Sequence, residues 1–130
     1  MTVLDVTGQT NLGITKKLQG YADQVLSADP LSVRTLTSYN AQVTLMEDRY
    51  GLIVDGSSLT LIMPVSENKE LLFQIAEKCS AVVCCRMSPL QKSEIVKMMK
   101  TSSRKPITAA VGDGGNDVAM IQAGVNIWLT

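Results

Sequence analysis

Two short apolar runs, residues 81–85 and 107–111, are each followed by residues that end a strand and start a helix. The first leads to Ser-Pro-Leu-Gln, a helix start with serine at the N-cap, proline at the first helical position and glutamine at the third. The second leads to Gly-Asp-Gly-Gly, where glycines let the backbone turn sharply. Continuous apolar strands are typical of parallel sheets that are buried on both faces. These runs therefore predict an α/β fold.

The rest of the chain continues this alternation of strands and helices. We expect further strands at residues 3–6, 51–54 and 125–129, and helices at residues 11–26, 67–79, 88–100 and 116–122. The buried face of the first helix is expected to draw on Leu12, Leu18, Ala22, Val25 and Leu26. The dipeptide after residue 54, Asp-Gly, reads as a turn, and residues 27–49 read as an irregular connection. The predicted architecture is one Rossmann-like domain over residues 1–130, a parallel sheet with helices on both faces.

Composition removes several classes of function. Twelve basic and twelve acidic residues cancel, which leaves no electrostatic footprint for binding nucleic acid. The absence of histidine excludes Ser-His and Cys-His nucleophile pairs and zinc sites built on histidine. Neither a signal peptide nor a long apolar span is apparent, so we expect a soluble piece that does not itself span a membrane.

Polar residues follow three of the expected strands. Thr7 and Gly8 come after the first strand, Arg86 after residues 81–85, and Asp113 after residues 107–111. In open parallel sheets, ligands bind at the carboxyl ends of the strands. We therefore expect these residues to meet at one edge of the sheet.

The glycine-rich turn after residue 111 has the composition of a metal or anion site. Asp113 and Asp117 offer carboxylate oxygens of the kind that Mg²⁺ prefers. Asn116 is expected at a helix N-cap, where it either satisfies that helix or binds a phosphoryl oxygen. The alternative interpretation of the same stretch is a tight turn followed by a capped helix.

Lys92 points to an anion at the same edge. It falls in the first turn of a helix, where the helix dipole disfavours a cation by roughly 0.3–1 kcal/mol. This location suggests an anion nearby, while a solvated surface lysine is the simpler interpretation.

Two long tracts carry a resemblance to a known family. Residues 82–92, VVCCRMSPLQK, and residues 111–122, VGDGGNDVAMIQ, resemble the phosphorylation domain of P-type ATPases. The double cysteine, Arg-x-x-Pro-Leu-Gln-Lys and Asp-Val-x-Met-Ile-Gln are similar to the phospholipid-flippase branch, and residues 51–59, GLIVDGSSL, extend the likeness upstream. The resemblance implies a haloacid-dehalogenase-like fold, of which this chain is the C-terminal part.

The resemblance also implies roles for the site residues. In that family an aspartate accepts the γ-phosphoryl group of ATP, and the resulting aspartyl phosphate is then hydrolysed. Lys92 corresponds to the lysine that neutralises the phosphoryl group, Asp113 to a Mg²⁺ ligand, and Asn116 and Asp117 to the polar positions behind it. Thr7 and Gly8 match the family's Thr-Gly-Asp, whose threonine contacts the phosphoryl group.

The chain also departs from the family pattern. The Asp-Lys-Thr-Gly nucleophile motif is absent, the nearest string being Asp-Val-Thr-Gly at residues 5–8, and Gln9 stands where the family has aspartate. We prefer the Thr-Gly-Asp interpretation of this string and do not assign Asp5 as the nucleophile. The isolated chain is therefore predicted to lack ATPase activity.

Two functions remain open at this point. The first is a part of an ATP-driven phospholipid flippase that supplies Mg²⁺- and phosphate-binding residues, with ATP, phospholipid and the other P-type ATPase domains as partners through the parent protein. The second is a flippase-like regulatory or structural module without ATPase activity, as in the membrane guanylyl cyclases of some protists. Either would place the chain on the cytosolic face of a membrane protein.

Overall fold

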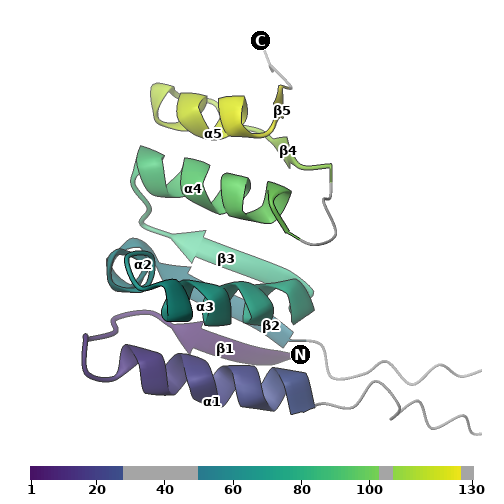
Figure 1. The fold of residues 1–130 in the computed structure, drawn as a ribbon. Coiled ribbons are helices and arrows are strands. Elements are labelled where there is room, and N and C mark those ends of the chain that lie inside the picture. The colour runs from purple at the N-terminus through teal and green to yellow at the C-terminus, as the bar shows by residue number, and fades with distance from the viewer. Residues whose placement is uncertain (28–49, 103–106, 127–130) are drawn as a thin grey trace, which may run out of the picture.

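The computed structural model describes residues 1–27, 50–102 and 107–126 (Figure 1). In chain order its elements are β1 (Thr2–Val6), α1 (Ile14–Ser27), β2 (Tyr50–Asp55), α2 (Gly56–Ile62), α3 (Ser66–Lys78), β3 (Ala81–Cys85), α4 (Pro89–Lys100), β4 (Ala109–Ala110), the 3₁₀ helix η1 (Gly115–Asp117), α5 (Val118–Ala123) and β5 (Val125–Asn126). The predicted α/β fold with a parallel sheet flanked by helices is confirmed. The irregular connection expected at residues 27–49 lies outside the described residues, except that Ser27 ends α1.

Strands β1, β2 and β3 form one parallel sheet in that order. Leu4 is paired with Leu52, which is paired in turn with Val82, so these side chains share one face. Because the strands are parallel, their carboxyl ends lie at one edge of the sheet, and in Figure 1 the arrows of β1 and β3 point the same way. Strands β4 and β5 pair in parallel in a second, two-stranded sheet.

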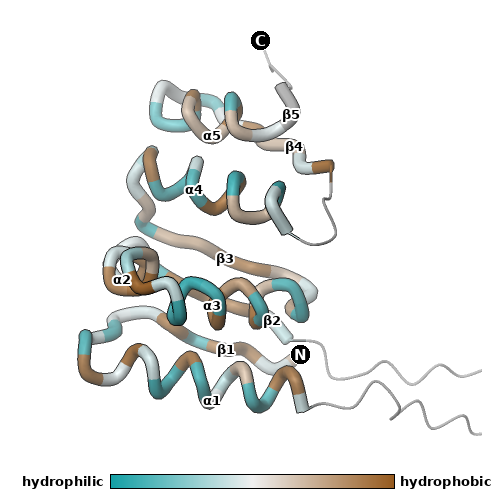
Figure 2. The backbone as a smooth tube through the Cα atoms, in the orientation of Figure 1, coloured by the Kyte–Doolittle hydropathy of each residue, from teal (hydrophilic) through white to brown (hydrophobic). Residues whose placement is uncertain are grey.

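The core lies between the three-stranded sheet and helices α1, α2 and α3. Figure 2 shows hydrophobic colour along the strands and alternating hydrophobic and hydrophilic colour along α1 and α3, as expected for strands packed under amphipathic helices. The buried side chains of this core come from both layers: Leu4, Val6, Ile14, Leu18, Ala22, Val25, Leu52, Val54, Leu59, Ile62, Leu72 and Ile75. Burying one such aliphatic side chain stabilises the fold by roughly 1.5–3 kcal/mol.

The face of the first helix differs from the prediction at both ends. Leu12 is 99% exposed because α1 begins two residues later, at Ile14, which is buried in its place. Leu26 is 50% exposed in the last turn. The three central predictions, Leu18, Ala22 and Val25, are confirmed as buried.

Strand β3 was predicted to be buried on both faces, and this prediction is wrong. Val82 and Val83 are 42% and 54% exposed. The physical reason is that β3 lies at the edge of the three-stranded sheet, where helices α1, α2 and α3 pack on β1 and β2 and leave the faces of β3 largely uncovered.

The predicted strands near the C-terminus are shorter in the structure. Of residues 107–111, only Ala109–Ala110 is paired, and Ile107 is 91% exposed. The strand expected at residues 125–129 is seen as Val125–Asn126, and its remainder lies outside the described residues. Helix α4 matches its predicted start and end at Pro89 and Lys100.

The Asp-Gly dipeptide after β2 was expected to form a turn, but it starts a helix: Asp55, the last residue of β2, is the N-cap of α2. Its carboxylate accepts hydrogen bonds from the Ser58 backbone N–H at 3.0 Å and the Ser57 hydroxyl at 2.8 Å, so it caps α2. The Gly8 N–H, at 3.3 Å, ties the end of β1 to the same carboxylate. These hydrogen bonds, those of Ser58 foremost, hold the pKa of Asp55 well below its ordinary value.

We predict that Asp55→Ala lowers the free energy of unfolding by about 1–2 kcal/mol, the usual effect of losing an N-cap. Asp55→Asn should cost less, because an amide oxygen still accepts from Ser58. Folding lowers the pKa of Asp55, so its ionised carboxylate stabilises the fold at pH values above its unfolded pKa. This stabilisation is lost progressively as the pH falls below about 4. The difference between wild type and Asp55→Asn in urea denaturation should therefore shrink below that pH. A difference that stays constant from pH 7 to pH 3 would contradict the assignment.

Candidate functional site

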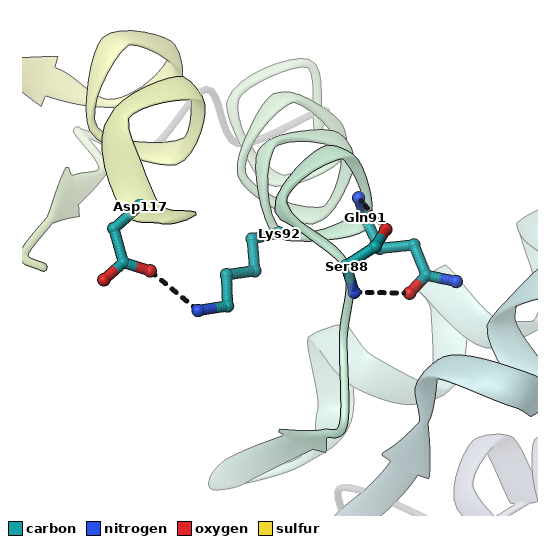
Figure 3. A network of polar contacts seen from close by, with 4 residues as sticks. All are labelled: Ser88, Gln91, Lys92 and Asp117. Atoms are coloured by element: carbon teal, nitrogen blue, oxygen red, sulfur yellow. Dashed lines mark hydrogen bonds and ion pairs between the residues drawn. The ribbon is translucent and has the colours of Figure 1, made fainter. Parts of the chain in front are cut away.

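Lys92 and Asp117, two of the predicted site residues, form an ion pair. Lys92 Nζ lies 2.7 Å from Asp117 Oδ1 (Figure 3). The Lys92 side chain is 31% exposed and that of Asp117 is 12% exposed, so the pair is partly shielded from water. Shielding weakens screening by salt and favours a defined geometry over a transient surface contact.

The start of α4 places Lys92 in its first turn. Ser88 Oγ accepts from the Gln91 N–H at 3.2 Å, and Gln91 Oε1 accepts from the Ser88 N–H at 3.0 Å. This is the capping box that the sequence predicted, with Pro89 at the first helical position. Helix α4 then packs against η1 and α5, which brings its first turn to the end of η1.

Asp117 is held by the turn that precedes it. The hydrogen bond from Lys92 lowers the pKa of the Asp117 carboxyl, and the N–H groups of Asp113 and Gly114 act in the same direction. The Asp117 side chain also lies directly against Gly112, where any Cβ would collide with it. Glycine at position 112 therefore makes room for the carboxylate beside the backbone.

The other predicted residues of this turn are exposed. Asp113 presents its carboxylate to solvent, and Asn116 is exposed within η1. The expectation that Asn116 is an N-cap is wrong, because Gly114 precedes η1 and Asp117 precedes α5, neither with a capping side chain. The tight 3₁₀ turn between Gly114 and Val118 takes up the residues that the sequence assigned to the start of an α-helix.

Thr7 and Gly8 bind groups of their own sheet. The Thr7 hydroxyl and N–H each donate to Asp5 Oδ1 at 2.8 Å, and the Gly8 N–H donates to Asp55. Within the described part of the chain, these two residues make no hydrogen bond to Lys92 or Asp117. Their predicted contact with a phosphoryl group stays a prediction.

Arg86 follows β3 at the same edge and is exposed. Its φ of 52° lies in the left-handed region, which costs a non-glycine residue roughly 1 kcal/mol or more. The strain turns the chain sharply from β3 toward α4, so Arg86 shapes the path that leads to Lys92.

The carboxylates of Asp113 and Asp117 fit a Mg²⁺ ion held by one or two protein oxygens, with water and phosphate oxygens completing its shell. The described residues contain no group of three or more His, Cys, Asp or Glu side chains that would hold a metal by themselves. Asp117 also shares its charge with Lys92. The protein's own contribution to such a site is therefore small.

Two adjacent hollows of about 320 and 360 Å³ lie between α3 and α4, away from the ion pair. Both are lined by Lys69, Met98 and Thr101; Met98 lies in the last turn of α4, and Thr101 is the residue that caps its C-terminus. Lys92 is in the first turn, so these hollows are not the predicted site.

Two important residues were missed in the sequence. Asp55 joins β1 to α2, and its signal was available as an acidic N-cap three residues before Ser58. Gln91 was recognised only as part of a capping box, although its Nε2 also donates to the Gly56 carbonyl at 2.7 Å. No local pattern signals that second contact, because Gly56 is 35 residues away.

The chain is similar to several phospholipid-transporting ATPases. It is 51% identical over 94 residues to phospholipid-transporting ATPase IH of Mus musculus, a match that covers 67% of this chain and 8% of that protein. Phospholipid-transporting ATPase 11C of Mus musculus is 44% identical over 107 residues, 78% of this chain and 9% of that protein. Phospholipid-transporting ATPase 1 of Arabidopsis thaliana is 43% identical over 91 residues, 68% of this chain and 8% of that protein. No protein-family model matches the chain.

These identities place the chain in the class of P-type ATPases, and its α/β fold with a parallel sheet is consistent with that class. Within that class, the chain belongs to the phospholipid-transporting ATPase family. It spans less than a tenth of the length of the relatives that it matches. Among the described residues, no helix is long and apolar enough to cross a membrane.

We predict that Gly112→Ala lowers the free energy of unfolding by about 1–3 kcal/mol, as overpacking does, because the new methyl group collides with Asp117. Gly115→Ala is the matched control, since a Cβ there meets nothing within 4 Å. Urea denaturation of both variants checks the prediction. Equal stability of the two variants would contradict the close packing of Asp117 on Gly112.

Proposed function

We propose that this chain supplies the phosphate- and Mg²⁺-binding side of the phosphorylation site of an ATP-driven phospholipid transporter. The observation that carries the proposal is the ion pair between Lys92 Nζ and Asp117 Oδ1 at 2.7 Å, which joins two sequence motifs of the family. Phosphoryl transfer depends mainly on positioning and on charge stabilisation, and a fixed lysine beside carboxylates provides both.

Lys92 is suited to neutralise a phosphoryl group while it stays paired. An ammonium group has three donors, of which Asp117 takes one. The remaining donors are available because the side chain is 31% exposed. Lys92 would thus hold a phosphoryl oxygen, and Asp117 would keep the lysine in place.

Asp113 and Asp117 would hold Mg²⁺ in the complete site. The ion would supply charge neutralisation for the phosphoryl oxygens. Asp113 is exposed and suited to bind the ion. Asp117 uses Oδ1 to pair with Lys92, so its Oδ2 would be the oxygen that binds Mg²⁺. Asn116 would donate to the phosphoryl group from the same exposed turn.

The residues at the ends of the first and third strands have supporting roles in this proposal. Arg86, exposed after β3, would attract the phosphates of ATP by charge. Thr7 and Gly8 would contact the phosphoryl group only after the Thr7 hydroxyl leaves Asp5.

Another segment would contribute the nucleophile. In the proposed reaction an aspartate oxygen bonds to the γ-phosphorus of ATP, the bond to the β-phosphate oxygen breaks, and ADP leaves; water later releases the phosphate. The sequence has no Asp-Lys-Thr-Gly motif to provide that aspartate. Among the described residues β3 is an edge strand of its sheet, and its unpaired backbone edge supports the addition of a further strand there. In the same proposal, the other domains of the parent protein move the phospholipid, and this chain lies on the cytosolic side of the membrane.

A flippase-like module without ATPase activity is the second candidate. The observation that favours it is the turn after β1, where the Thr7 hydroxyl is bound by Asp5 and the Gln9 side chain donates to the Thr7 carbonyl at 2.8 Å. Because these polar groups are already hydrogen-bonded within the turn, they are not free to bind a phosphoryl group. Metal binding separates the two candidates, because only the first needs it.

We predict weak Mg²⁺ binding, millimolar or weaker, because two protein carboxylates leave most of the octahedral shell to water. Titration of the chain with Mg²⁺ should shift the amide NMR signals of residues 112–117 selectively. Asp113→Asn should remove these shifts while the other signals keep their positions.

The control for this titration is Asp23→Asn, which changes an exposed carboxylate on α1. It should leave the Mg²⁺ shifts of residues 112–117 intact. Shifts centred on Asp55 or on residues 67–77, with residues 112–117 silent, would favour the module without a metal site.

A further inference from the structure

The side chain of Gln91 is engaged at both ends of its amide. Its Oε1 accepts from the Ser88 N–H at 3.0 Å, which closes the capping box of α4. Its Nε2 donates to the Gly56 carbonyl oxygen at 2.7 Å and approaches Thr60 Oγ1 at 3.2 Å. One residue therefore caps α4 and binds the first turn of α2.

The surroundings of Gly56 are built for this approach. A Cβ at position 56 would collide with the Arg86 carbonyl oxygen and would lie 2.9 Å from Gln91 Oε1. Arg86 itself adopts a φ of 52° where the chain passes Gly56. A strained residue and a glycine thus meet at the point where the amide of Gln91 reaches α2.

Gln91 is the polar link between two parts of the molecule. One part is the three-stranded sheet with α1, α2 and α3, and the other is α4 packed on η1 and α5. Among the hydrogen bonds of residues 1–27, 50–102 and 107–126, those of Gln91 alone connect the two parts. Apolar contacts of Met87 and Ile95 with the core complete the connection, but such contacts are not directional.

We infer that Gln91 is a positioning residue that fixes the first turn of α4, and with it Lys92, relative to the carboxyl edge of the sheet. Lys92 is the next residue in the chain, so a shift of Gln91 moves the lysine directly. Gly56 follows Asp55, which also binds the Gly8 N–H, so the link runs from the end of β1 to the ion pair. The inference rests on the proposed function only where it calls Lys92 a phosphate ligand.

Helix capping alone is the competing explanation, and three variants separate it from positioning. Gln91→Glu keeps an oxygen that accepts from Ser88 but loses the donor to Gly56. Gln91→Met loses both contacts without adding charge. Ser88→Ala removes the serine half of the capping box and leaves the bond to Gly56 in place.

The first measurement uses residual dipolar couplings of backbone amides in the 130-residue chain. In wild type and Ser88→Ala, the amides of α4 and α5 should share one alignment with those of β1–β3. In Gln91→Glu and Gln91→Met the two parts should need different alignments, because the directional link is lost. A single alignment in both Gln91 variants would overturn the inference.

The second measurement is the affinity for inorganic phosphate, determined from the NMR shifts of the backbone amides in the first turn of α4. Gln91→Met should weaken binding by roughly 2- to 10-fold, because the hydrogen bond that positions the first turn of α4 against Gly56 is lost, and Ser88→Ala, which keeps that bond, should change it less. Equal weakening by the two variants would mean that capping explains the effect, against the inference. If wild type binds no phosphate, the proposed function fails, and the dipolar couplings still decide whether Gln91 positions α4.

Discussion

The ion pair between Lys92 and Asp117 joins a helix start to the end of a tight turn. A lysine in the first turn of a helix is opposed by the helix dipole, by roughly 0.3–1 kcal/mol. Asp117, 2.7 Å away and 12% exposed, supplies the compensating negative charge. Glycine at position 112 leaves the space that this carboxylate needs, because a Cβ there would collide with Asp117 at the end of η1.

The parallel sheet determines where this chemistry lies. Strands β1, β2 and β3 run in one direction, so the turns that follow them gather at one edge. Asp55 joins the first of these turns to α2, and Gln91 joins α2 to α4. A few directional hydrogen bonds between helix starts therefore connect the sheet to the ion pair, while the apolar core supplies most of the stability.

The sequence predicted those features that depend on local chemistry. The capping box at Ser88 and the alternation of strands and helices were correct, because caps and strand patterns are set by neighbouring residues. The residues at the strand ends were expected at the edge of one sheet, whereas Asp113 follows β4, which belongs to a second sheet. Lys92 is paired with Asp117. The resemblance of residues 82–92 and 111–122 to one family pointed to the same two residues.

The failures came from features that depend on distant parts of the chain. The exposure of β3 follows from its place at the edge of a sheet, which its apolar sequence does not reveal. Leu12 is apolar but precedes the helix, and Asn116 sits in a 3₁₀ turn that its polar type does not signal. The contact of Gln91 with Gly56 spans 35 residues and is visible only in the folded structure.

Lys92 and Asp117 form an ion pair with a fixed geometry, in which Lys92 Nζ donates a hydrogen bond to Asp117 Oδ1. NMR of the lysine ammonium groups tests it most directly, through the coupling across the hydrogen bond between Lys92 Nζ and Asp117 Cγ. We expect a slowly exchanging Lys92 signal with this coupling, lost in Asp117→Asn and kept in Asp113→Asn. A Lys92 signal without coupling to Asp117, unchanged in Asp117→Asn, would contradict it.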